Sequence, residues 1–294
     1  MNSNTKGHIL AVITVMIWGT TFISTKTLLH DFTPVEILFF RFLMGLILLT
    51  AAYPKILRTK DIHREGVFAL AGLTGVCLYY LMENVALTYT TASNVGVIVA
   101  TAPFFTALLS GDIRKGNVFF FIGFALSMAG ISLISFTSAG PDFNPVGDLL
   151  ALSAAFMWAC YSVLLKKISF YGYNTIQSTR RIFLYGIIFM IPAVIISKAS
   201  FDMSRFADMT NLFNILFLGA GASALCFVTW NCSVKILGAL KTSVYIYMVP
   251  VVTVVFSTLI LKEKMTTASL AGTLLTIAGL IVSQKKKELK KAAG

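Results

Sequence analysis

One carboxylate lies deep inside a long apolar run of this chain. The stretch 79–89 reads YYLMENVALTY and places Glu83 directly before Asn84. If this run crosses a bilayer, a charge there is costly, and such residues usually have a function or a charged partner. Three interpretations follow for Glu83: it binds a proton or a substrate amine, it pairs with Arg41, or it is solvated and inert at the outer interface.

The composition indicates an integral membrane protein. The chain is 57% hydrophobic and 12% charged, with a mean hydropathy of +0.82, whereas soluble domains carry about 25% charged residues. The net charge of +12 comes from short segments between apolar runs and from the C-terminal tail. That distribution is typical of membrane proteins and differs from the basic stripe of a nucleic-acid-binding protein, so we expect no nucleic-acid partner.

Ten apolar runs are long enough to cross a bilayer as helices, which takes about 20 residues each. Placing the N-terminus in the cytoplasm puts 17 lysines and arginines on the cytoplasmic side and 5 outside. Such a bias sets orientation, so we predict a multi-pass protein of the inner or plasma membrane with both termini cytoplasmic. The expected spans are 8–29, 34–53, 66–89, 92–110, 117–137, 147–167, 178–197, 210–234, 240–261 and 267–284.

The second half of the sequence repeats features of the first. Because five spans are an odd number, a duplicated five-span unit enters the membrane from the opposite side, as in the inverted repeats of many secondary transporters. We therefore predict two inverted five-helix repeats, 1–138 and 139–294, which together form one transmembrane domain. The alternative is chance matching of Gly, Trp and Pro among apolar helices. Matching pairs include Trp18 with Trp158 and Arg41 with Arg181 at an offset of 140, Asn84 with Asn231 and Pro103 with Pro250 at 147, and Gly123 with Gly272 and Gly130 with Gly279 at 149.

Several segments resemble a known family in their order and spacing. They are IWGTTFISTK (17–26), PVEILFFRFLMG (34–45), ALTYTTASNVGVIVATAPFFTALL (86–109), ALKTSVYIYMVPVVTVVFSTLILKEKMT (239–266) and SLAGTLLTIAGLIVS (269–283). Over nearly the whole chain the sequence resembles the EamA-type branch of the drug/metabolite transporter superfamily. The resemblance implies ten helices in two inverted halves and alternating access around a central cavity. It also implies substrates such as amino acids, their derivatives, nucleobase-like metabolites or lipophilic cations, which are often exported.

The residues expected to bind a substrate are polar or aromatic residues placed inside the spans. Three residue types keep a second interpretation open. Trp18 and Trp158 could be packing residues, Arg41, like Arg181, could have a structural role, and the asparagines could join helices without any ligand. Glu83 is also the candidate coupling residue, and Pro103 and Pro250 are candidate hinges or fixed bends. The full set of substrate-binding candidates is Trp18, Arg41, Tyr79, Tyr80, Glu83, Asn84, Asn94, Trp158, Tyr161, Trp230, Asn231, Tyr245 and Tyr247.

These features together favour a secondary-active transporter that moves a small organic metabolite by alternating access. An amino acid or a related compound, moved in the direction of export, is the favoured substrate, with a proton as a candidate coupling ion and lipid as the surroundings. The alternative is a proton-coupled exporter of lipophilic cations with Glu83 as counter-ion. The sequence has no GxxxxGK[ST], GxSxG or HExxH motif and no Cys/His metal spacing, so we predict no cofactor and no enzymatic activity.

Overall fold

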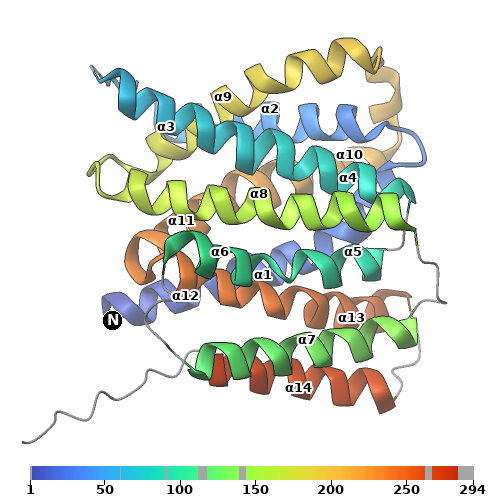
Figure 1. Cartoon of the computed structure of the whole chain (residues 1–294). Helices are drawn as coiled ribbons and strands as arrows, with labels where there is room; N and C mark the ends of the chain where they lie inside the picture. The colour runs from blue at the N-terminus through green and yellow to red at the C-terminus, as the bar shows by residue number, and fades with distance from the viewer. Residues whose placement is uncertain are drawn as a thin grey trace, which may run out of the picture.

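The computed structural model describes residues 2–59, 61–89, 92–111, 118–138, 144–261 and 267–283. Within these ranges every regular element is a helix, as Figure 1 shows. The first half contains α1 (Ser3–Leu28), α2 (Pro34–Ala52), α3 (Ile62–Gly72), η1 (Leu73–Leu78), α4 (Tyr79–Tyr89), α5 (Ala92–Val99), α6 (Ala102–Ser110) and α7 (Val118–Ser138). The second contains α8 (Pro145–Ser169), α9 (Thr175–Ile196), η3 (Met203–Ala207), α10 (Met209–Leu216), η4 (Phe217–Leu225), α11 (Cys226–Leu237), α12 (Ala239–Ser243), η5 (Val244–Tyr247), α13 (Met248–Leu261) and α14 (Thr267–Ser283).

Among the described residues, six continuous helical segments are long and apolar enough to cross a membrane. They are Ser3–Leu28, Pro34–Ala52, Ile62–Tyr89, Pro145–Ser169, Thr175–Ile196 and Met209–Leu237. Shorter apolar helices cover Val118–Leu133, Ala239–Thr253 and Leu270–Ser283. The prediction of an all-helical chain with many apolar helices is confirmed for the described residues.

Local sequence explains where the long helices begin. Before α2, Thr33 and Glu36 form a capping box in which each side chain accepts the backbone N–H of the other, and Pro34 has the fixed backbone angle suited to a first turn. Asn144 and Asn174 cap α8 and α9 in the same manner, with side-chain oxygens that accept backbone N–H groups of the first turn. Such caps provide acceptors for the backbone N–H groups of the first helical turn, which have no partner within the helix.

Two helical segments are interrupted just before a proline. α5 ends at Val99 and α6 begins at Ala102, and the 3-10 turn η5 precedes α13. Pro103 and Pro250 lack the N–H that would bond to the carbonyl four residues earlier, which belongs to Val99 or Ile246. The expected disruption at these prolines is thus present: the α-helix is interrupted at residues 100–101 before Pro103, and a 3-10 turn replaces α-helical geometry before Pro250.

The two halves of the chain are packed into each other. α1 packs against α11 and α13, α8 against α4 and α6, α2 against η4 and α9, and α9 against α3. A single main core includes Phe42 from α2, Phe183 from α9 and Phe227 from α11, whose rings meet edge to face with centroids 5.0–5.7 Å apart. Neither half therefore buries its apolar face alone.

α7 and α14 lie side by side at one edge of the molecule (Figure 1). A Cβ atom added to Gly123 would lie 2.5 Å from the carbonyl oxygen of Gly279, and one added to Gly130 would lie 2.5 Å from that of Gly272. Glycine is thus required for this close approach. Because the contact on α14 moves from 279 back to 272 as α7 advances from 123 to 130, the two helices are antiparallel.

Candidate functional site

A cavity lies between helices of both halves, next to the end of α5 and the 3-10 turn η5. Its open volume is about 40 Å³, and one water molecule needs about 10–15 Å³, so it holds a few waters in this conformation. A larger ligand requires the helices or side chains around it to move. The lining residues are Trp18, Thr21 and Phe22 of α1, Tyr79, Tyr80 and Glu83 of α4, Gly96 and Val99 of α5, Trp158 of α8, Ile246 of η5 and Val249 of α13.

Glu83 faces this cavity. The residue is 7% exposed, and one carboxylate oxygen accepts a hydrogen bond from the Tyr79 hydroxyl over 3.0 Å. Tyr79 lies one turn earlier on α4, so local helical geometry is sufficient to hold the carboxylate in place. Glu83 is the one acidic residue in the cavity lining of the described chain.

Arg41 is buried close to the cavity but does not line it. The residue is 2% exposed, its Nε donates to the Ser223 hydroxyl over 3.0 Å, and its Cζ lies 4.5 Å from the centroid of the Tyr80 ring. No carboxylate of the described residues, Glu83 included, lies within 4.0 Å of the guanidinium. Arg41 thus neither extends to a membrane surface nor forms a direct ion pair with Glu83.

The three tryptophans lie together, and their indole nitrogens have different environments. The ring centroid of Trp18 lies 5.2 Å from that of Trp158 and 5.0 Å from that of Trp230. Trp18 Nε1 donates to the carbonyl oxygen of Ala222 over 3.0 Å, whereas the buried Nε1 atoms of Trp158 and Trp230 have no partner in the described structure. Trp18 and Trp158 line the cavity, and Trp230 does not.

Several predicted site residues instead join helices outside the cavity lining. Asn231 accepts a hydrogen bond from Tyr161 over 3.0 Å and donates to Thr179 over 2.9 Å, so this amide connects α8, α11 and α9. Asn84 donates to the carbonyl oxygen of Pro34 over 3.4 Å. Such interhelical bonds are common in membrane proteins without any ligand.

Tyr245 and Tyr247 are likewise not part of the cavity lining. Tyr245 hydrogen-bonds to Nδ1 of His8 over 2.5 Å, and the buried hydroxyl of Tyr247 has no partner among the described atoms. Asn94 belongs to α5, but its side chain lies outside the described residues. The cavity therefore brings together Trp18, Tyr79, Tyr80, Glu83 and Trp158 from the predicted set.

Sequence reasoning missed the apolar part of the lining. Val99 and Ile246 were not expected, yet each lies four residues before a proline, Val99 at the end of α5 and Ile246 in the 3-10 turn η5. That spacing is the signal that could have identified them. Phe22, Gly96 and Val249 have no comparable signal.

Comparison with known proteins identifies the family. A sequence profile described as "EamA-like transporter family" matches residues 5–136 and 145–284. The chain belongs to the EamA-like transporter family. The resemblance noted from the sequence is thereby confirmed, and this EamA-like protein is a multi-pass membrane transporter rather than an enzyme.

Relatives of this EamA-like transporter align along almost its whole length. A protein of Archaeoglobus fulgidus named "Uncharacterized transporter" is 32% identical over 97% of this chain and 99% of its own. Proteins named "Probable amino-acid metabolite efflux pump" are 23% identical in Escherichia coli and 26% in Salmonella typhimurium, each over 95% of this chain and 94% of its own. A solved structure titled "Crystal structure of protein" superposes with a TM-score of 0.78 at 18% identity, over 96% of this chain and 98% of its own, which indicates a shared fold.

Proposed function

We propose that this protein is a secondary-active transporter that exports an amino acid or an amino-acid-like metabolite by alternating access. The observation that carries this proposal is Glu83, a buried carboxylate facing a cavity built from helices of both halves. A carboxylate in that position can bind a substrate amine or a coupling proton, and an intramembrane acid is rarely retained without such a role.

The proposed architecture is ten spans in two inverted repeats, 1–138 and 139–294. The family profile matches the chain in two stretches, and the π-helical segments η1 and η4 occupy corresponding places in them. The contacts of Gly123 with Gly279 and of Gly130 with Gly272 also support it. If 123 corresponds to 272 and 130 to 279, a two-fold axis between α7 and α14 converts one contact into the other.

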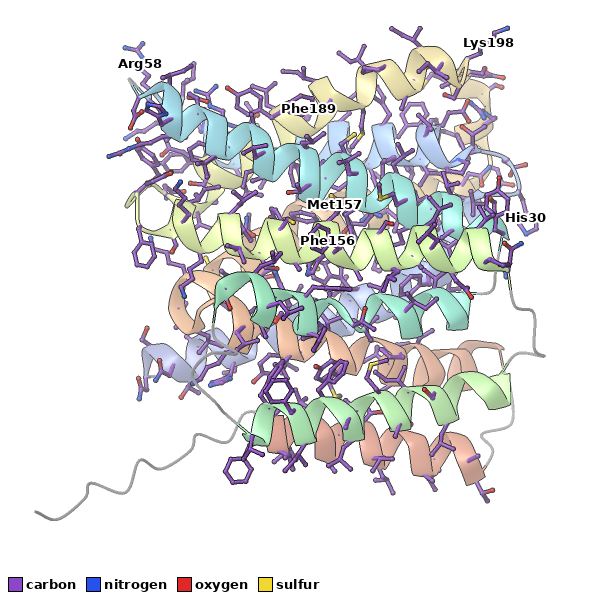
Figure 2. All side chains as sticks on the ribbon, viewed as in Figure 1. His30, Arg58, Phe156, Met157, Phe189 and Lys198 are labelled. Carbon is purple, nitrogen blue, oxygen red and sulfur yellow. The ribbon has the colours of Figure 1, made fainter. Side chains whose placement is uncertain are left out.

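Alternating access is supported by the small volume of the cavity, about 40 Å³, and by ion pairs at both ends of the bundle. Figure 2 shows Arg58 at one end and His30 and Lys198 at the other. At the His30 end, Glu36 pairs with Arg205 over 3.0 Å. At the Arg58 end, Arg181 pairs with Glu65 over 3.2 Å.

The proposed orientation places the Arg58 end in the cytoplasm of a cell that carries the protein in its inner or plasma membrane. The N-terminus lies at this same end (Figures 1 and 2). Lys55, Arg64, Lys167 and Arg180 belong to the segments that meet there, which agrees with the positive-inside rule.

The substrate class is proposed from the cavity and from the relatives. Trp18, Tyr79 and Trp158 surround Glu83 with aromatic rings, which suit an apolar side chain next to an ammonium group. The names of the Escherichia coli and Salmonella typhimurium relatives agree with an amino-acid-like compound. A second candidate is a lipophilic cation, because an aromatic cavity with one carboxylate also binds such ions.

Transport in proteoliposomes tests the proposal. Vesicles preloaded with each of the standard amino acids should exchange them with external labelled amino acid in a saturable manner, and protein-free vesicles should not. Exchange of tetraphenylphosphonium without exchange of any amino acid would favour the second candidate. If neither compound moves, the proposed substrate classes are wrong.

A further inference from the structure

The guanidinium of Arg41 is a buried cation with no carboxylate of the described residues within 4.0 Å, and Glu83 interacts with its charge only at longer range. Its Nη2 is fully buried and has no hydrogen-bond partner in the described structure, and its Nε bonds only to the neutral hydroxyl of Ser223. A charge removed from water without a directly bonded counter-charge is unfavourable. The position therefore has an unused capacity to bind an anion.

One aromatic ring separates this cation from the cavity. Tyr80 lines the cavity, and its ring centroid lies 4.5 Å from the Arg41 Cζ. Glu83 follows Tyr80 by three residues on α4, so both side chains are on the same face of that helix. Rotation of the Tyr80 side chain would extend the cavity toward the guanidinium, so that a cation and a carboxylate would face one enlarged space.

We propose that Arg41 is the carboxylate-binding half of the substrate site and that the Tyr80 ring covers it while the site is empty. This inference rests on the function proposed above and narrows the substrate class to compounds with both an amine and a free carboxylate. The carboxylate would occupy the free Nη2 of Arg41, and the ammonium group would bind Glu83. A charge-assisted hydrogen bond is stronger than the contact of the guanidinium with a neutral ring. Binding of a zwitterion would therefore favour movement of the Tyr80 ring away from Arg41.

The corresponding arginine of the second half has a different environment. The Arg181 side chain is 23% exposed and pairs with Glu65 over 3.2 Å, and its Nη2 donates to the carbonyl oxygen of Leu57 over 2.8 Å. Its charge is thus neutralised by the protein itself. Arg181 is a matched control, since it has the same side chain at the corresponding position but already has a carboxylate partner, although its buried Nε forms no hydrogen bond in the described structure.

Binding to the detergent-solubilised full-length protein tests this inference. The probes are the standard amino acids, followed by the amide and the decarboxylated amine of whichever amino acid binds most tightly. Wild-type protein should bind the acid at least about tenfold more tightly than the amide, because the amide cannot form the charge-assisted bond. Arg41→Lys should bring the two affinities close together with the affinity for the amide unchanged, and Arg181→Lys should keep the wild-type preference.

Two outcomes would overturn the inference while leaving amino-acid transport in place. In the first, wild-type protein binds the acid and its amide equally well, a measurement that needs no variant and so does not depend on the folding of Arg41→Lys. In the second, Arg41→Lys weakens both ligands to the same extent, which indicates a purely structural arginine. If no amino acid binds at all, the proposed function itself fails, and this inference fails with it.

Discussion

The indole rings of Trp18 and Trp158 meet edge to face in the middle of the protein, with centroids 5.2 Å apart and planes at 81°. They stand at corresponding places of the two proposed repeats and both line the cavity. The Nε1 of Trp18 is bonded to Ala222, whereas that of Trp158 has no partner among the described atoms. One ring therefore connects two helices, and the other has an N–H group free for a ligand.

This difference predicts that a Trp→Phe substitution lowers mainly stability at position 18 and mainly ligand affinity at position 158. Trp18→Phe removes a buried hydrogen bond and should destabilise the protein by about 1 kcal/mol beyond the effect of the smaller ring. Trp158→Phe should weaken ligand binding with a smaller loss of stability. Thermal unfolding and ligand affinity measured on both variants would check this, and equal unfolding temperatures with equal affinities would contradict it.

Glu83→Gln should remove the pH dependence of substrate binding. The groups around the carboxylate are Tyr79, Tyr80 and the buried Arg41. Protonation of Glu83 removes the charge that holds a substrate amine, so wild-type affinity should fall as the pH is lowered from about 8 to about 5. The Gln variant cannot titrate and should bind weakly at every pH.

A control for this experiment is Tyr79→Phe, which removes the donor to the carboxylate and keeps the ring. The substrate affinity of this variant should still depend on pH, but over a pH range displaced from that of the wild-type protein. Normal transport by Glu83→Gln over the whole pH range would show that this carboxylate has no coupling role.

Pro103→Ala and Pro250→Ala should slow transport without changing equilibrium binding. Alanine supplies the missing N–H, so the helix can continue through the break and resist the motion that opens the cavity. Pro192 is a control because it lies inside α9 and is exposed on the outside of the bundle. Its alanine variant should transport at the wild-type rate, and the same result for Pro103→Ala and Pro250→Ala would mean that these positions are fixed bends.

Cysteine labelling tests the proposed orientation. Ser204 in η3 and Arg58 between α2 and α3 are exposed and belong to opposite ends of the bundle. In a protein whose four native cysteines are replaced by alanine, Ser204→Cys should react with an impermeant maleimide on intact cells. Arg58→Cys should react only after the membrane is permeabilised. The reverse pattern would show that the protein has the opposite orientation.

The sequence alone was sufficient to predict the membrane class, the helical content and the family. Hydropathy is a local property, so a run of apolar residues indicates a span whatever surrounds it. A carboxylate in such a run must also avoid lipid, and Glu83 is accordingly buried. The prolines at 103 and 250 likewise predicted disrupted helices from covalent structure alone.

Only the tertiary structure decided which of the polar residues share a cavity. Asn231 and Glu83 were equally plausible site residues, but Asn231 is bonded to Tyr161 and Thr179, whereas Glu83 faces open space. A polar group inside a membrane can form its hydrogen bonds with a neighbouring helix or with water in a cavity. The spacing of polar residues along the sequence of a helix is the same in both cases. The choice depends on how each helix is rotated and which distant segment packs against it, and these are properties of the folded chain as a whole.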